Sequence, residues 1–245
     1  MCPRELLLSL MLIYASTIVF SQNAPFDRNE PLPTIAEKLQ QHHIALTKSA
    51  LVTALRNPDA EVRYLAAAQL AANRARDTIA SIIEALTAER VPLTRVNIAF
   101  ALAQMGEKKG FAELKSTCDD AHVPSHFRIT AASYLLDVHD EHCLPSVLRM
   151  LRSDAEPNTR MLALSILNRF EHIQKKDFSE MHHLVLNALA DPDPSVRLTA
   201  SSTLSSIGDS SDIQNLQNSI ADEQDEVVRS EMQADLQRLA AKTEY

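Results

Sequence analysis

Apolar residues recur along the chain in a pattern that repeats every 32 to 37 residues. Each repeat can be aligned on an arginine that has an apolar residue three positions later and a leucine seven positions later. Positions −1, +3 and +7 from the arginine lie on one side of an α-helix, so the pattern predicts a helix with a buried stripe in every repeat. The six arginines are Arg63, Arg95, Arg128, Arg160, Arg197 and Arg229, and the leucines are Leu70, Leu102, Leu135, Leu167, Leu204 and Leu236.

A shorter apolar pattern precedes each of these helices, as Leu51 and Leu55 do in the first repeat. A polar turn separates the two patterns, for example Asn-Pro-Asp at residues 57–59. Proline is well tolerated in the first turn of a helix, where its missing N–H has no helical partner. Three repeats have a proline three residues before the arginine, namely Pro92, Pro157 and Pro194. We therefore expect an all-α chain in which each repeat is a helix, a short acidic turn and a second helix.

An N-terminal capping helix is expected before the first repeat. Thr34 is a good N-cap residue, and Glu37 follows three residues later, as in a capping box. Such a helix would cover the open end of a stack of repeats, where the core would otherwise be exposed. Residues 22–33 are polar and contain prolines, so we interpret them as a flexible leader and expect the repeats within residues 34–245.

Two segments show the repeat most clearly: NPDAEVRYLAAAQL at residues 57–70 and DPDPSVRLTASSTL at residues 191–204. Both resemble the HEAT-repeat family, including its bacterial HEAT-like branch named after phycobilin lyases. The resemblance implies an α-solenoid of about six two-helix repeats, with the second helices on the concave side. It specifies the architecture much better than the function.

The resemblance also implies that the aspartate of the turn interacts with the arginine of the second helix along the stack. Asp59, Asp193 and Asp225 fit this pattern, because each stands four residues before an arginine. Glu89 and Asp154 stand six residues before theirs and depart from it. The expected fold does not depend on this pair.

The composition argues against several classes of function. The three glycines, Gly106, Gly110 and Gly208, cannot form a phosphate-binding loop or a dinucleotide fingerprint. The formal net charge of −8 is unfavourable for binding a nucleic-acid backbone, which requires a basic face. The sequence also lacks the Gly-x-Ser-x-Gly and His-Glu-x-x-His motifs. We therefore expect no catalytic residue, no cofactor and no nucleic-acid partner.

The N-terminus is typical of a signal peptide. Residues 6–20 form a largely apolar run without charge, Arg4 lies before it, and Val19 and Ser21 suit a signal peptidase. We expect cleavage after Ser21, which makes residues 1–21 the signal peptide and the protein periplasmic or secreted. The alternative is an uncleaved anchor, although the run is shorter than the roughly 20 apolar residues that span a bilayer. Membrane contact is expected only through such an uncleaved segment.

Cys118 and Cys143 would remain in the exported chain. An exported protein can hold a disulfide, but two cysteines do not make a disulfide-rich scaffold. Cys118 occupies a position where other repeats have core residues. We therefore expect it to be a packed free thiol rather than a nucleophile.

His139, His142 and Cys143 form the best candidate for a metal site, because zinc and iron bind histidine, cysteine and carboxylate ligands. The segment lies in a turn between repeats, where polar residues are expected anyway, and no other repeat supplies an evident fourth ligand. One branch of the resembled family, deoxyhypusine hydroxylase, binds iron through His-Glu dipeptides, and no histidine here precedes a glutamate. A metal-dependent enzyme or accessory factor is therefore only the alternative hypothesis.

The remaining candidate is a surface. Positions +2, +6 and +9 are expected to point away from the stripe, and in the central repeats they carry apolar residues with a charged rim, which is typical of a protein-binding patch. The predicted protein-binding residues are Asn97, Thr130, Tyr134, Asp137, Leu162, Ile166 and Arg169. Alternatively, Leu162 and Ile166 belong to the core because their helix is slightly rotated.

These observations predict a non-catalytic scaffold that is exported from the cytoplasm and binds a protein or peptide on its concave helices. A further possibility is an adaptor within a larger membrane-associated assembly.

Overall fold

The computed structural model describes residues 33–153, 156–170 and 172–243. The signal peptide predicted for residues 1–21 and the leader up to residue 32 lie outside the described residues. From Thr34 onward the chain forms one compact unit. None of the helices described is long and apolar enough to span a membrane.

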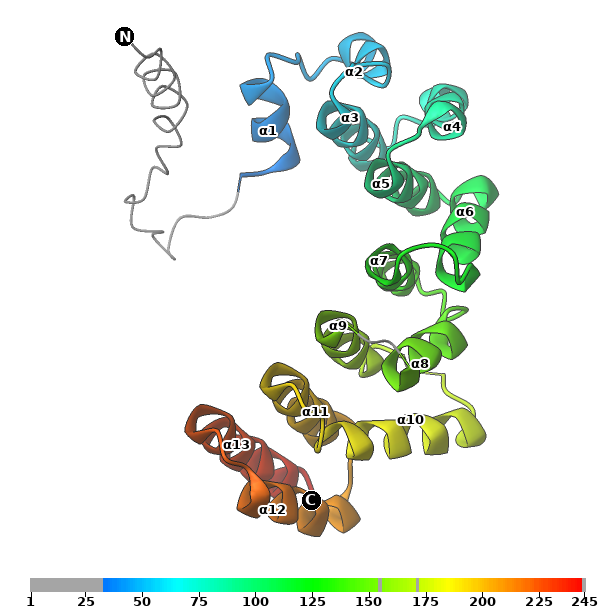
Figure 1. Cartoon of the computed structure of the whole chain (residues 1–245). Helices are drawn as coiled ribbons and strands as arrows, with labels where there is room; N and C mark the ends of the chain where they lie inside the picture. The colour runs from blue at the N-terminus through cyan, green and yellow to red at the C-terminus, as the bar shows by residue number, and fades with distance from the viewer. Residues whose placement is uncertain (1–32, 154–155, 171, 244–245) are drawn as a thin grey trace, which may run out of the picture. The chain divides into compact units, whose positions relative to one another are not determined.

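The described part of the chain is all-α, and its helices follow the predicted alternation (Figure 1). After α1 (Ile35–Gln41), the first helices of the repeats are α2 (Lys48–Ala54), α4 (Ile79–Ala88), α6 (Lys108–Asp119), α8 (Leu144–Ser153), α10 (Lys175–Ala188) and α12 (Ile213–Asp222). The second helices are α3 (Ala60–Ala72), α5 (Pro92–Gln104), α7 (Ser125–Asp137), α9 (Pro157–Leu167), α11 (Pro194–Ile207) and α13 (Glu226–Thr243). Two 3₁₀ helices, η1 (Arg76–Thr78) and η2 (Ser210–Asp212), precede α4 and α12. The predicted solenoid of two-helix repeats is confirmed.

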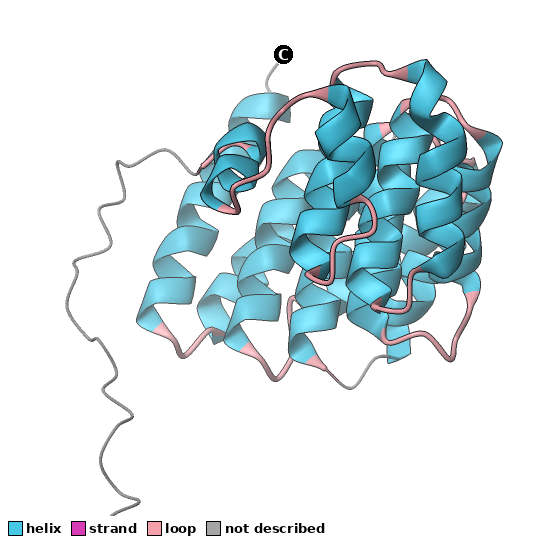
Figure 2. Cartoon of the chain, turned by 90° about the horizontal axis from the view of Figure 1, so that it is seen from above, coloured by secondary structure: helices cyan, strands magenta, loops and turns pink. Residues whose placement is uncertain are grey.

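The helices form two rows. Each second helix packs against the second helix of the next repeat, from α3 through α5, α7, α9 and α11 to α13. Each first helix packs on the second helix of its own repeat, and Figures 1 and 2 show the short loops that join the rows. We call these rows the second-helix layer and the first-helix layer.

The predicted stripe forms the core between the layers. The +3 residues are fully buried in all six repeats, from Ala66 to Met232, and the +7 leucines are fully buried in the first five. Leu236, the sixth, is half-buried because α13 is the last described helix of the row. Burying a leucine contributes roughly 1.5–3 kcal/mol, so this stripe supplies much of the driving force for stacking.

The N-terminal cap forms as predicted. The Thr34 Oγ1 atom accepts a hydrogen bond from the Glu37 N–H at 3.2 Å, and the Thr34 N–H donates to the Glu37 carboxylate at 2.7 Å. The helix packs against α3 and buries Leu39 completely. This arrangement covers the end of the second-helix layer.

The expected pairing of the turn aspartate with the arginine is wrong, because the arginine binds a different acid. Asp59 accepts a hydrogen bond from the Glu61 N–H at 2.8 Å, so it is the N-cap of α3. Arg63 instead reaches the next repeat, where its Nε and Nη2 atoms donate to the two carboxylate oxygens of Glu89 at 2.7 and 2.9 Å. Its Nη1 atom donates to the Asn57 carbonyl of its own turn at 2.8 Å. One guanidinium therefore connects two successive turns.

The bond to the acid of the next turn recurs in two later repeats. Arg160 donates to both carboxylate oxygens of Asp191 at 2.8 Å, and Arg197 donates to those of Glu223 at 2.6 and 2.8 Å. In each case the acid stands six residues before the next arginine of the repeat. We call this contact the arginine bridge.

Arg95 binds differently. An acid that could form the bridge with Arg95 is missing, because the residue six positions before the next arginine, Arg128, is His122. Arg95 pairs instead with Glu113 of α6, and its Nη2 atom lies 2.8 Å from the Glu113 Oε2 atom. The Nε atom of Arg128 donates to the Cys118 carbonyl at 3.0 Å. Arg95 therefore still joins α5 to the next repeat, but through a helix rather than a turn.

The bridges shift the acidity of their carboxylates. Hydrogen bonds from Arg197 lower the pKa of Glu223 from 4.5 to about 2, although burial acts in the opposite direction. At Glu89 burial acts to raise the pKa, but hydrogen bonds from Arg63 and from two backbone N–H groups outweigh it and the pKa is lowered. The folded state therefore favours the ionised carboxylate, and the bridge contributes stability while that charge is present.

A disulfide joins Cys118, at the end of α6, to Cys143, just before α8. The expectation of a free thiol at Cys118 is therefore wrong. Both cysteines are almost completely buried, and their Cα atoms lie 6.1 Å apart, within the range that a disulfide spans. The sequence could not reveal this pair because the two residues belong to different repeats and meet only when the repeats stack.

Glu223→Gln should lower the free energy of unfolding by on the order of 3 kcal/mol at neutral pH, because it removes one charge of a buried pair. Since the folded-state pKa is about 2 and the unfolded value 4.5, this contribution is complete above about pH 5 and is lost as the pH falls toward 2. Urea unfolding near pH 7, 5 and 3 should show the difference from wild type shrinking at the lowest pH. The matched control is Glu231→Gln, an exposed carboxylate, which should change stability by less than about 0.5 kcal/mol. A difference that is constant with pH would contradict the assignment.

Gly110 lies where α6 approaches α5 closely. A Cβ at this position would stand 2.5 Å from the Ala103 nitrogen and 2.5 Å from the Ala99 oxygen, which are backbone atoms. Gly110→Ala should therefore destabilise the protein by roughly 1–3 kcal/mol through overpacking, even though alanine favours a helix by about 1 kcal/mol. Thermal unfolding beside Lys108→Ala, an exposed position on the same helix, measures the effect. A more stable Gly110→Ala variant would show that the helices do not meet this closely.

Candidate protein-binding groove

A groove of about 510 Å³ opens on the second-helix layer. It crosses α3, α5 and α7, and Ile35 of α1 lies at its edge. Small, aromatic and a few polar side chains line it: Ile35, Tyr64, Ala68, Ala71, Ala72, Arg74, Asn97, Phe100, Ala101, Gln104 and Tyr134. The groove therefore spans three successive repeats.

The shape of the groove follows from the sizes of its side chains. The helix α3 contributes Ala68, Ala71 and Ala72, which leave space, whereas α5 and α7 contribute the rings of Phe100 and Tyr134. These two rings stack with centroids 4.1 Å apart and an angle of 10° between their planes. Such a pair forms a firm apolar wall, because each ring limits the movement of the other.

Polar groups sit beside this wall. The Tyr134 hydroxyl donates to the Asn97 Oδ1 atom at 2.6 Å. Burial raises the pKa of Tyr134, so the hydroxyl stays protonated and keeps donating at neutral pH. The Asn97 side-chain N–H groups have no partner among the described residues, and they are available to a carbonyl group of a ligand.

Arg74 marks one end of the groove. It follows α3 with a left-handed φ of 52°, and the Ala75 N–H donates to the Leu70 carbonyl at 3.1 Å, as in a Schellman motif. Its side chain is exposed and makes no ion pair within the described structure. The next acid along the chain, Asp77, is already bonded to Lys48 at 2.6 Å.

Two of the predicted binding residues, Asn97 and Tyr134, line this groove. Thr130 is half-buried on α7, and its hydroxyl donates to the His126 carbonyl of the same helix at 2.8 Å. Arg169 pairs with Asp137 and also donates to the Ser133 hydroxyl at 2.9 Å. These last contacts join the turn after α9 to α7, so the predicted charged rim is a link between repeats.

The expectation that position +6 faces outward is wrong. Ile166 is only 7% exposed, and Ala101 and Asp235 at the same position are 1% exposed. Neighbouring second helices pack side by side, so position +6 of one helix faces the next helix in the row. Ile166 belongs to the core, and Leu162 is half-buried and packs against it. The apolar surface therefore lies over the first three repeats rather than over the third and fourth.

The sequence did contain a sign of this position. The second helices of the last three repeats have no aromatic residue, whereas α3, α5 and α7 have Tyr64, Phe100 and Tyr134 on the groove side. These three residues stand at positions +1, +5 and +6, so alignment on the arginine separates them. The stacked helices bring them together.

The proposed metal ligands do not converge. Cys143 is bonded to Cys118, and His139 has a left-handed φ of 59° at the end of α7. The His142 Nε2 atom lies 2.7 Å from the Asp119 carboxylate. Within the described ranges no group of three or more histidine, cysteine or acidic residues is placed to hold a metal ion.

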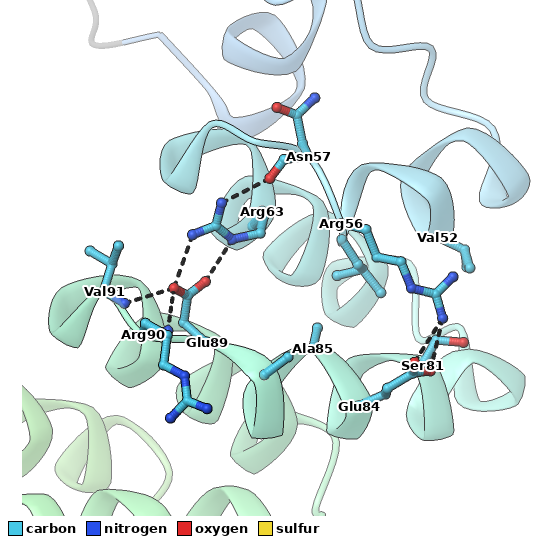
Figure 3. A pocket seen from close by; sticks show the side chains of 12 residues that line it. Val52, Arg56, Asn57, Arg63, Ser81, Glu84, Ala85, Glu89, Arg90 and Val91 are labelled. Atoms are coloured by element: carbon cyan, nitrogen blue, oxygen red, sulfur yellow. Dashed lines mark hydrogen bonds and ion pairs between the residues drawn. The ribbon is translucent and has the colours of Figure 1, made fainter.

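A second pocket, of about 350 Å³, lies between α2 and α4 on the first-helix layer (Figure 3). Four of its charged side chains form two ion pairs, Arg63 with Glu89 and Arg56 with Glu84 at 2.9 Å. Similar pockets surround Arg160 with Asp191 and Arg197 with Glu223. Because they recur with the arginine bridge, we interpret them as a consequence of stacking rather than as sites.

Comparison with known proteins concerns the fold. Among solved structures, the chain is similar to human deoxyhypusine hydroxylase in complex with glycerol, with 17% identity, 79% of this chain and 74% of that chain covered, and a TM-score of 0.43. It is also similar to the complex of CpcE and CpcF of phycocyanin lyase from Nostoc sp. PCC7120, with 19% identity, coverages of 88% and 92%, and a TM-score of 0.40.

Neither similarity bears on the activity of this chain. No curated protein matches the sequence. The family model for HEAT repeats matches residues 49–135 and 144–237, which together are most of the chain. The chain belongs to the HEAT-repeat family.

Proposed function

We propose that this protein is a non-catalytic scaffold that binds an extended segment of a partner protein in the groove across α3, α5 and α7. The observation that carries the proposal is the stacked pair of Phe100 and Tyr134 beside a row of alanines. Aromatic side chains contribute disproportionately to protein interfaces, because they bury a large apolar area at a small entropic cost. A groove that crosses three helices suits a segment that lies across the repeats rather than a compact ligand.

The polar groups of the groove support binding rather than catalysis. Its lining residues include arginine, asparagine, glutamine and tyrosine, but no histidine, cysteine, serine or carboxylate. A nucleophile and a general base that contact each other are the usual requirement for group transfer. Asn97 and Gln104 instead offer amide groups that match the donors and acceptors of a peptide backbone.

Export from the cytoplasm is the second part of the proposal. The apolar run at residues 6–20 is typical of a signal peptide. The disulfide between Cys118 and Cys143 supports the same compartment, because such bonds persist in the periplasm and outside the cell and are rare in the reducing cytosol.

Protein purified from its native source without reductant should begin at Gln22, and neither Cys118 nor Cys143 should react with an alkylating reagent until the disulfide is reduced. N-terminal sequencing and peptide mapping after alkylation measure both. A chain that begins at Met1 would contradict cleavage, and labelling of both cysteines without reductant would remove the support from the disulfide.

Filling the groove should abolish partner binding without unfolding the chain. Ala72 is exposed in the groove, so Ala72→Trp should occupy the space of the ligand; Ala80→Trp, exposed on α4, is the matched control. With a photoreactive amino acid at Gln104 of the full chain, irradiation of producing cells should yield discrete protein adducts. We expect these adducts to fall about tenfold in the Ala72→Trp background and to persist with Ala80→Trp, with similar melting temperatures for both. Adducts that survive Ala72→Trp would place the partner elsewhere.

A further inference from the structure

The charge in the groove is unusual for this chain. The molecule has a formal net charge of −8, yet the groove is lined by one cation and no acid. That cation is Arg74, and it makes no ion pair within the described structure. By contrast, Arg63, Arg95 and Arg197 each hold a carboxylate of the following repeat.

The position of Arg74 is fixed by the fold. The residue occupies the left-handed turn that ends α3, where backbone hydrogen bonds hold the chain on both sides. The alanines at the end of α3 lie immediately before it in the same groove, and the Phe100 and Tyr134 rings come from the neighbouring helices. An apolar surface and a guanidinium therefore meet within one site.

We infer that the groove selects an extended peptide segment in which an apolar side chain stands close to a carboxylate. The apolar side chain packs against Phe100 and Tyr134, the carboxylate binds the guanidinium of Arg74, and the N–H groups of Asn97 bind a backbone carbonyl between them. This inference deepens the proposed function and rests on it. A guanidinium can donate two parallel hydrogen bonds to a carboxylate, which gives direction as well as attraction.

Peptide selection on the purified full chain tests the inference. A display library of random 12-residue peptides is selected on wild type, on Arg74→Glu and on Ala72→Trp. Wild type should enrich peptides with an apolar residue near Asp or Glu, or near a free C-terminus. Arg74→Glu should replace the acidic preference with a preference for Lys or Arg, and Ala72→Trp should remove the enrichment. Arg76→Glu, an exposed arginine in η1 that does not line the groove, is the matched control and should keep the acidic preference.

The enriched peptides then identify the source of the carboxylate. Replacing the side-chain acid by its amide, or amidating the C-terminus, should weaken binding to wild type about tenfold in whichever peptide supplies the contact. The same change should have little effect on binding to Arg74→Gln, since a double-mutant cycle isolates the pair.

Three outcomes would overturn the inference in different ways. If apolar peptides are enriched and lost in Ala72→Trp but show no acidic preference, the groove binds peptides and the role of Arg74 is wrong. If Arg76→Glu shifts the preference as much as Arg74→Glu, the attraction is a general effect of surface charge. If Ala72→Trp changes nothing, both the inference and the proposed function fail.

Discussion

At three steps of the stack, a guanidinium group that binds the acid of the next turn gives the packing of the repeats its direction. Burial of apolar surface is strong but has no direction, so it allows neighbouring helices to slide and rotate. The arginine bridge adds direction, because a planar group can satisfy the carbonyl groups of its own turn and the carboxylate of the next turn in one arrangement only. Glu89 and Glu223 are almost completely buried, and removing them from water is costly unless their oxygens remain bonded. The bridges satisfy those oxygens, and the pKa of each carboxylate falls accordingly.

The sequence predicted what depends on local periodicity. The helices, the buried stripe and the capping box around Thr34 all follow from spacings within one or two turns, and the structure confirms them. The partner of an arginine lies in the next repeat instead. The family resemblance pointed to the aspartate at position −4, but at Arg63, Arg160 and Arg197 the acid at position −6 of the following repeat makes the contact. The disulfide was missed for the same reason, since Cys118 and Cys143 meet only through stacking.

The groove shows the same limit of prediction from the sequence. Phe100 and Tyr134 occupy different positions in their repeats, yet their rings stack. A surface that depends on the rotation of each helix cannot be predicted from equivalent positions in the aligned repeats. Ile166 is buried, although its position in the repeat predicted that it would face a partner. In a repeat protein the shared residues determine the fold, and the residues that depart from the repeat give each surface its own chemistry.

The disulfide closes a covalent loop around α7, the helix that presents Tyr134 to the groove. Under a pulling force, the segment inside this loop responds differently from the rest of the chain. A pulling force between the two ends is carried through hydrogen bonds and apolar contacts at most steps of the stack, but at this step it passes through a bond that cannot be stretched open. The segment between the two cysteines therefore contributes no extension, and its closure raises the free energy of its unfolded form by roughly 3 kcal/mol. The helix that carries Tyr134 is thus bypassed by a pulling force, which passes through the disulfide instead.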